Sequence, residues 1–237
     1  MKEQTQILIL ILLLFVLPIS CVKLNPDDNI STIEINRINN VLIGNEGNFQ
    51  LGNASLSIYN KNDKTINNNA YNQINQQFIG DVLHSISHIE NEYFLVVNNS
   101  GKIIIINDQD LSYNREINNL TSPRHIIKVN NSKYYVSDLY SNTISVISSD
   151  LQLTNTIPVA GWCEEMIMFN GNVFVCNVVN DQLYVINTDT DSIIDSISMG
   201  KHPIAITEDN NEQLWVLNQG DPTNSIQATI KSINPYN

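Results

Sequence analysis

The chain has 237 residues, of which 42% are hydrophobic and 15% are charged, and this is enough for a globular domain with a real core. Its formal net charge is −12. Binding to phosphate groups requires clustered lysine and arginine, so this charge argues against a nucleic-acid partner. An acidic surface mainly promotes solubility.

The first predicted element is a leader over residues 1–20. Residues 7–16 form an unbroken apolar run that is too short to span a bilayer stably. The run leads into Ser20 and Cys21, and this order resembles the signal of bacterial lipoproteins. The resemblance implies that Cys21 becomes the lipidated first residue after cleavage. The alternatives are an ordinary secretory signal and an uncleaved anchor, and both also place the protein outside the cytoplasm.

Residues 21–40 are polar and weakly patterned, which predicts a tether between the membrane and a folded domain. The acidic pair Asp27 and Asp28 lies shortly after the cysteine. Such pairs resemble the surface-export signals of Bacteroidota lipoproteins, although a solvated linker carries the same charges.

Residues 41–237 contain a repeat of about 40 residues, which we interpret as the blades of a β-propeller. Each unit consists of short runs rich in Val, Ile, Thr and Tyr, separated by turns of Asn, Ser and Asp, as is typical of strands. An Asn or Asp closes the second strand in four successive units, at Asn98, Asp138, Asn177 and Asn218. The predicted fold class is therefore all-β, with four strands per blade.

Five units are recognisable in chain order. The first has strands at residues 41–43 and 54–59 and then a polar segment over residues 60–77, which predicts a long surface connection. The second, third, fourth and fifth units begin near Gly80, Ser122, Gly161 and Lys201. The pair Asn170-Gly171 predicts a type I′ hairpin turn in the fourth unit.

The third strands predict how neighbouring blades pack. An isoleucine recurs at the same place in four of them, at Ile106, Ile147, Ile186 and Ile233, and we expect it to lie between adjacent sheets. The sequence ends at Asn237 after a third strand. A closed five-bladed ring would need residues 32–35 to complete the last blade, and a truncated chain is the alternative that we favour.

Cys163 and Cys176 flank the Asn170-Gly171 turn. The expected register makes them diagonal neighbours, which is poor geometry for a bridge. The two alternatives for these cysteines are a disulfide between them and two small buried side chains.

The four histidines are His84, His88, His125 and His202, and they form no metal-binding spacing in the sequence. No nucleophile, phosphate-loop or dinucleotide motif is present in the sequence. We therefore predict no catalytic residue, no metal ligand and no cofactor.

Candidate ligand-binding residues follow from position within the repeat. In a propeller, the loops that lead into the innermost strands share one rim with the loops that follow the second strands. Aromatic and polar side chains gathered there are suited to a small molecule. The residues predicted to bind on this rim are Asn45, Arg124, Asp138, Tyr140, Trp162, Glu164, Asn177, His202 and Asn218. The alternative is that the Asn and Asp residues cap turns and that Trp162 plugs the channel.

The sequences Tyr135-Val136-Ser137-Asp138 and Leu183-Tyr184-Val185-Ile186-Asn187, together with His202-Pro203, resemble the YVTN-type (YncE-like) β-propeller repeats. Four further segments are similar to Bacteroidota cell-surface propeller lipoproteins: Ser122-Pro123-Arg124, Asp138-Leu139-Tyr140-Ser141, the run from Trp162 to Met166, and Leu214-Trp215-Val216. Some members of that group capture corrinoids at the outer membrane and pass them to a TonB-dependent transporter. The resemblance implies a seven-bladed ring, of which this chain would be a part.

The first functional hypothesis is a lipid-anchored outer-membrane protein, exposed at the surface, that binds a small molecule without transforming it. The resemblance makes a corrinoid the expected ligand and a TonB-dependent transporter the expected partner. A protein-interaction scaffold is the alternative. A propeller lyase with a metal and a rim histidine, His125 or His202, is the second alternative.

Overall fold

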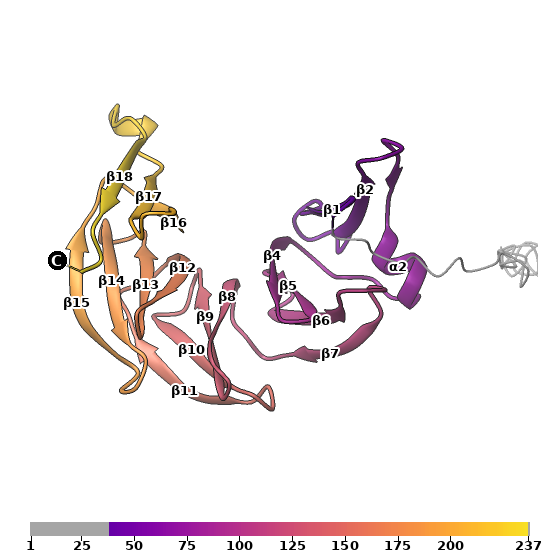
Figure 1. Ribbon diagram of the computed structural model, residues 1–237, viewed down its shortest axis with the longest axis horizontal. Coiled ribbons are helices and arrows are strands. Elements are labelled where there is room, and N and C mark those ends of the chain that lie inside the picture. Colours follow the sequence, from indigo (N-terminus) through magenta and orange to yellow (C-terminus); the bar gives the residue numbers. More distant parts are fainter. Residues whose placement is uncertain (1–37, 237) are drawn as a thin grey trace, which may run out of the picture. The chain divides into compact units, whose positions relative to one another are not determined.

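The computed structural model describes residues 38–236 (Figure 1). The predicted leader, Cys21 and nearly all of the predicted tether lie outside the described residues, as do residues 32–35. Within residues 38–236, no helix is long and apolar enough to cross a membrane.

The fold is a β-propeller of five antiparallel blades, so the predicted fold class is confirmed (Figure 1). Each blade is a meander of consecutive strands. Blade one contains β1 (Asn40–Asn45), β2 (Ser55–Asn60) and β3 (Ile66–Asn67). Blade two contains β4 (Leu83–Ile89), β5 (Glu92–Val97), β6 (Lys102–Asn107) and β7 (Tyr113–Ile117). Blade three contains β8 (Pro123–Asn130), β9 (Lys133–Asp138), β10 (Thr143–Ser148) and β11 (Leu153–Pro158).

Blade four has four strands like blades two and three, whereas blade five has three like blade one. Blade four contains β12 (Cys163–Phe169), β13 (Asn172–Asn177), β14 (Gln182–Asn187) and β15 (Ser192–Ser198). Blade five contains β16 (Pro203–Glu208), β17 (Leu214–Asn218) and β18 (Thr229–Ile233), with a short 3₁₀ turn, η1 (Pro222–Asn224), between its second and third strands. The first strands β4, β8, β12 and β16 contact one another in succession and are the innermost strands.

The hairpin turns are formed by the residues that the sequence predicts for them. Asn170 and Gly171 have φ values of 45° and 77°, as a type I′ turn requires. Other asparagines bond to the backbone of the turn that follows them. The side chain of Asn130 accepts from the backbone N–H of Ser132, and that of Asn187 accepts from the N–H of Asp189. The abundance of asparagine in this chain is thus explained in part by turn formation.

The hydrophobic core lies between the blades. Four clusters of buried side chains fill the spaces between successive sheets. The predicted isoleucines take the expected positions, because Ile106, Ile147 and Ile186 are fully buried there and Ile233 packs against the last cluster. Each blade is therefore stabilised by its neighbours, as the repeat pattern predicts.

The terminal blades differ from the central three in the exposure of one face. In β17, Trp215 and Leu217 are 38% and 39% exposed and alternate with fully buried residues. In β1, Val41 and Ile43 are 42% and 38% exposed. Each terminal sheet therefore has one apolar face packed against its neighbour and one accessible to solvent.

The segment over residues 60–77 was predicted to be a surface connection, and this is wrong for part of it. The segment forms β3 and a short helix, α2 (Ala70–Asn75). Ala70 and Tyr71 are buried in the cluster between blades one and two. These two apolar residues fall within an asparagine-rich sequence, so periodicity gives no helical signal there.

Cys163 and Cys176 are free thiols and both are buried. Cys163 lies in the cluster between blades three and four, whereas Cys176 lies in the cluster between blades four and five. The two side chains therefore point to opposite faces of blade four. The reason is a register shift in β12, which pairs Cys163 with Asn177.

An ion pair joins blades three and four away from the innermost strands. The Asp191 carboxylate accepts a hydrogen bond of 2.5 Å from Lys133 Nζ and another from the hydroxyl of the buried Tyr135. Burial, followed by the bond to Asp191, raises the pKa of Tyr135 far above its usual range. This contact links β9 to the turn after β14.

Candidate functional site

The innermost strands of blades two to five all contain a register shift near their first residue. The shifts fall between Leu83 and Ser85, Pro123 and Ile126, Cys163 and Met166, and Pro203 and Ala205. A bulge of this kind re-aims the side chains within it. In blades two, three and four the shifted residues include His84, Arg124, His125 and Glu164.

Glu164 is the centre of the resulting cluster. The residue is 3% exposed, and its carboxylate accepts three hydrogen bonds from Arg124, of 2.7 to 3.1 Å. Trp162 donates its indole N–H to Oε1 at 2.5 Å. The Arg124 guanidinium carbon also lies 6.0 Å from the centre of the Trp162 ring, which is a cation–π contact. Residues of two blades thus hold this carboxylate in one orientation.

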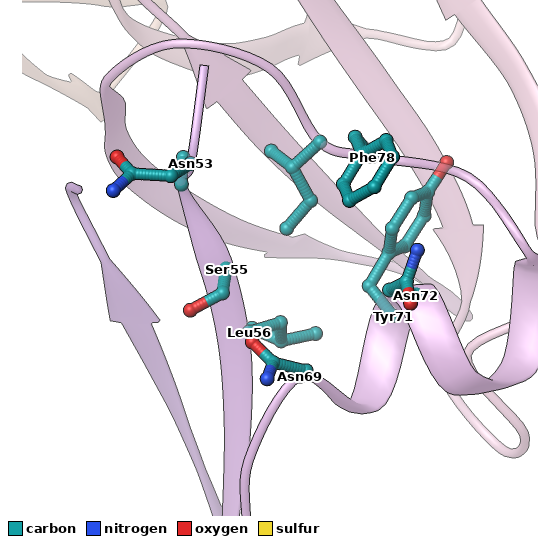
Figure 2. Close-up of a pocket in the computed structure, with 9 residues that line it drawn as sticks. Asn53, Ser55, Leu56, Asn69, Tyr71, Asn72 and Phe78 are labelled. Atoms are coloured by element: carbon teal, nitrogen blue, oxygen red, sulfur yellow. The ribbon is translucent and has the colours of Figure 1, made fainter. Parts of the chain in front are cut away.

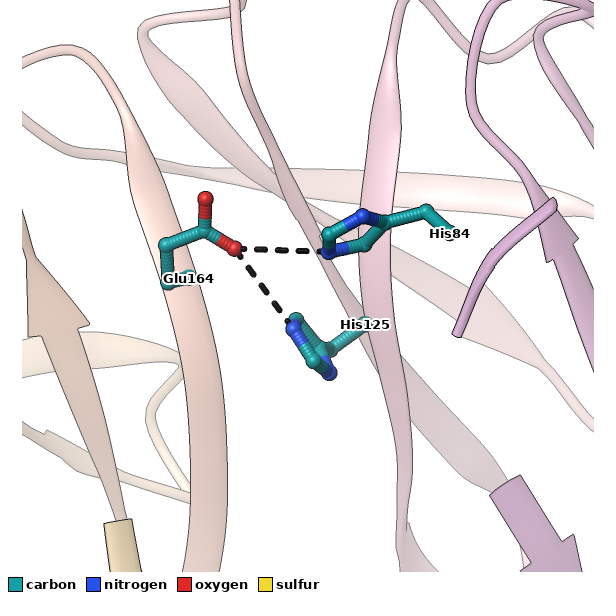
Figure 3. A group of neighbouring side chains, drawn as sticks. All are labelled: His84, His125 and Glu164. Carbon is teal, nitrogen blue, oxygen red and sulfur yellow. Dashed lines mark ion pairs between the residues drawn. The ribbon is translucent and has the colours of Figure 1, made fainter. Parts of the chain in front are cut away.

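Two histidines approach the other oxygen of the same carboxylate (Figure 3). Nε2 of His84 lies 3.6 Å from Oε2 of Glu164, and Nε2 of His125 lies 3.5 Å from it. The imidazole rings meet edge to face, with centroids 5.2 Å apart. The donor atoms of His84, His125 and Glu164 lie within 4.8 Å of one another.

Burial raises the pKa of Glu164, but the neighbouring groups have the larger combined effect in the opposite direction. His125, His84 and Arg124 together hold the pKa of this carboxyl far below its usual range. The group is therefore a permanent carboxylate at neutral pH, and it faces one guanidinium, one indole and two imidazoles. Such a group can orient a ligand or bind a cation.

Three of the nine predicted ligand-binding residues meet in this cluster: Arg124, Trp162 and Glu164. The other polar ones bond within the fold. Asp138 accepts from the backbone N–H groups of Ser122, Tyr140 and Ser141.

The asparagines at the corresponding positions are bonded in a similar way. Asn177 donates to the carbonyl of Ala160, Asn218 to Thr229, and Asn45 to Ser55 and Ser57. Asp138, Asn177 and Asn218 are buried. The contacts of Asp138 and Asn177 match the turn-capping alternative, whereas Asn45 and Asn218 bond to the strand paired with their own. Binding of a ligand by these four residues stays a prediction.

Tyr140 and His202 lie outside the cluster. Tyr140 is 76% exposed. His202 bonds through Nδ1 to the carbonyl of Gly220, and its backbone N–H donates to Asp181. Asp181 also pairs with Lys201 at 2.9 Å. Burial raises the pKa of Asp181, but these bonds outweigh it and lower the pKa below its usual value.

His84 was not among the predicted site residues, and His125 was considered only for a lyase. The sequence does carry a signal for His84. His84, Arg124 and Glu164 occupy the same place in successive units, 40 residues apart. The repeat therefore brings them to equivalent positions in neighbouring innermost strands.

A separate pocket of about 190 Å³ lies in blade one, between β2 and α2 (Figure 2). Leu56, Tyr71, Phe78 and Ile79 line it together with neutral polar residues such as Asn69. No charged side chain lines this pocket, and none of the residues around Glu164 contributes to it. We place the candidate site at the cluster because that is where charged and aromatic groups converge.

Fold and site together define a β-propeller with an asymmetric charged cluster on its innermost strands. The chain belongs to the family described as domain of unknown function DUF5074, whose model matches residues 39–236. A comparison with curated protein sequences gives no match.

Several solved propellers share the fold at low identity. A quinoprotein alcohol dehydrogenase-like protein from Bacteroides thetaiotaomicron is 14% identical with a TM-score of 0.63, over 83% of this chain and 49% of that one. The β-propeller domain of Cps50 (Swd1) from Myceliophteria thermophila is 11% identical with a TM-score of 0.58, over 78% of this chain and 67% of that one.

Hydrazine synthase from Kuenenia stuttgartiensis is 16% identical with a TM-score of 0.55, over 61% of this chain and 43% of that one. This chain thus spans less than half the length of hydrazine synthase and of the Bacteroides protein. The likenesses show the fold alone.

Proposed function

We propose that this protein binds a small molecule at the cluster around Glu164 and does not transform it. The observation that carries the proposal is the convergence of an arginine, a tryptophan, two histidines and a buried carboxylate from three neighbouring blades. A few convergent polar groups beside an aromatic ring are typical of ligand sites. Arg124 and His125 remain 16% and 21% exposed, so their side chains are accessible to a ligand.

We propose a corrinoid as the ligand and delivery to an outer-membrane transporter as the purpose. The support for both comes from the resemblance of the 122–124 and 162–166 segments to corrinoid-capturing lipoproteins. We also propose that Cys21 carries the lipid anchor at the outer membrane. Replacing Cys21 with Ala should move the protein from the membrane fraction to the soluble fraction.

Titration calorimetry of the purified protein with cobalamin tests the ligand. We expect saturable heat from the wild-type chain and at least a tenfold weaker affinity for Trp162→Ala. Trp215→Ala is the matched control, because Trp215 also donates its indole N–H to a carboxylate, that of Asp209, but lies on the exposed face of blade five. Absence of heat at micromolar protein and millimolar cobalamin would exclude the corrinoid. Equal affinities of the two variants would exclude this site.

A protein-interaction scaffold is the second candidate, and two exposed side chains favour it. Tyr140 and Val179 are 76% and 56% exposed, and each follows the second strand of its blade. Aromatic and apolar side chains in such loops are suited to a protein partner. Capture of the transporter by the wild-type chain but not by a Tyr140→Ser, Val179→Ser variant would support this reading. Equal capture by both would argue against it.

A further inference from the structure

We propose that His84, His125 and Glu164 bind a divalent transition-metal ion, with Nε2 of each histidine and Oε2 of the glutamate as ligands (Figure 3). The three residues come from β4, β8 and β12, so the site is formed only when blades two, three and four are assembled. The proposal goes beyond small-molecule binding and does not depend on it.

The distances from the Glu164 carboxylate to the two imidazoles favour an ion between them over direct hydrogen bonds. The separations of 3.5 and 3.6 Å from Oε2 to the imidazole nitrogens are longer than an ordinary hydrogen bond. Zinc binds nitrogen and oxygen ligands at about 2.0–2.1 Å in a tetrahedron, so that two ligands of one ion are about 3.3 Å apart. These two separations are within a few tenths of an ångström of that value, and the donor atoms of all three residues lie within 4.8 Å of one another.

Oε1, the Glu164 oxygen that is not proposed as a metal ligand, is held by hydrogen bonds. Arg124 and Trp162 both bond to Oε1, at 2.7 and 2.5 Å. Arg124 Nε also donates to Oε2 at 3.1 Å, and the two histidines approach Oε2 at 3.5 and 3.6 Å. Carboxylate ligands in metal sites are commonly held by such outer contacts, which orient the ligand before the ion arrives.

The ligand set indicates which kind of ion fits. Two imidazoles and one carboxylate are a common set for catalytic zinc and for non-haem iron, and both kinds of site keep further positions open for water or a ligand. Cobalt within a corrinoid does not fit this set, because the macrocycle occupies the equatorial positions and leaves only axial ones. The three protein ligands therefore favour a free ion.

The local charge predicts what would occupy an open position. Glu164 and Arg124 neutralise each other, so a divalent ion would leave the cluster with an excess of positive charge. A hydroxide or an anionic group of a ligand would offset that charge. Metal and ligand would then share one site.

Zinc binding to the purified full chain tests the proposal. After treatment with a chelator and its removal, calorimetry with Zn²⁺ should show one strong site per chain and a higher melting temperature. We expect His84→Ala and His125→Ala each to weaken Zn²⁺ binding at least 100-fold. Trp162→Phe removes only the hydrogen bond to Oε1 and should weaken it about tenfold. His202→Ala is the matched control and should bind as the wild type does.

The outcomes are distinguishable from those of the cobalamin titration. Absence of a strong Zn²⁺ site in the wild-type chain would overturn the metal site, whether or not cobalamin binds. Equal Zn²⁺ affinity of wild type and of a His84→Ala, His125→Ala variant would also overturn it, because the ion would then bind elsewhere. Far-ultraviolet circular dichroism shows whether each variant is folded. If the double variant does not fold, the Trp162→Phe result decides, and wild-type affinity in that variant counts against the proposal.

Discussion

Replacing Glu164 with Gln should destabilise the protein by about 3 kcal/mol at neutral pH in the presence of a chelator. The change keeps the shape of the side chain but removes the charge that pairs with Arg124. The side chains of Glu164 and Arg124 are 5% and 16% exposed. Removing one partner of a buried pair typically costs about 3–5 kcal/mol, because the other charge is left without compensation. We take the lower end since the arginine retains some contact with water.

The chain contains a matched pair for this experiment. Glu92 at the start of β5 and Arg115 in β7 of blade two make two hydrogen bonds of 2.7 and 2.9 Å, but their side chains are 21% and 41% exposed. Glu92→Gln should therefore cost only about 0.5–1 kcal/mol. In a domain of this size, about 3 kcal/mol lowers the melting temperature by roughly 6–12 °C.

Urea unfolding followed by circular dichroism measures both variants. The slope of the free energy against urea concentration should stay constant, so that the shift in midpoint reports stability alone. Costs that agree within about 0.5 kcal/mol would refute the argument that burial makes the Glu164 pair the stronger one. The Glu164→Gln, Arg124→Gln double variant should lose less than the sum of the two single variants.

Two further predictions concern acidic residues outside the cluster. Asp191→Asn weakens the contact that joins blades three and four and should cost about 2 kcal/mol in urea unfolding. Asp189→Asn, the same change at an exposed side chain two residues earlier, should cost less than about 0.5 kcal/mol. Similar losses of stability in the two variants would contradict a structural role of Asp191. Asp181 has a lowered pKa, so its stabilising effect is present above the unfolded value of about 3.9 and is lost as the pH falls. Asp181→Asn should therefore lose less stability than the wild type between pH 6 and pH 3, and an unchanged acid sensitivity would disprove the assignment.

The blades and their core could be predicted because both signals are local. Short alternating runs separated by asparagine turns give the strands, and one isoleucine per third strand gives the contact between sheets. The helix α2 could not be predicted in this way. Its two buried residues are surrounded by asparagines, and their burial depends on blade two, which is remote in sequence.

The candidate site could be predicted only in part, because a register shift decides which side chains meet. A regular hairpin across Asn170-Gly171 would place Cys163 diagonally from Cys176. The shift in β12 instead pairs Cys163 with Asn177 and places Glu164 within the irregular segment. Position in the loops that lead into the innermost strands did identify Arg124, Trp162 and Glu164. Applied to the second unit, the same reasoning points to His84, which takes the place of Arg124 there, but its contact with Glu164 two blades further on is seen only in the structure.

Comparison of the blades with one another separates structural positions from the site. The residue at the end of the second strand, or directly after it, is Asn or Asp in four blades. Its bonds to nearby backbone are of the same kind in Asp138 and Asn177. A position that keeps its chemistry in every blade serves the common fold. One position in the innermost strand instead changes from His84 to Arg124 to Glu164. Packing alone would not require three different ionisable groups at equivalent places. Their difference makes complementary contacts across the blades, and this is how a repetitive fold acquires a single asymmetric site.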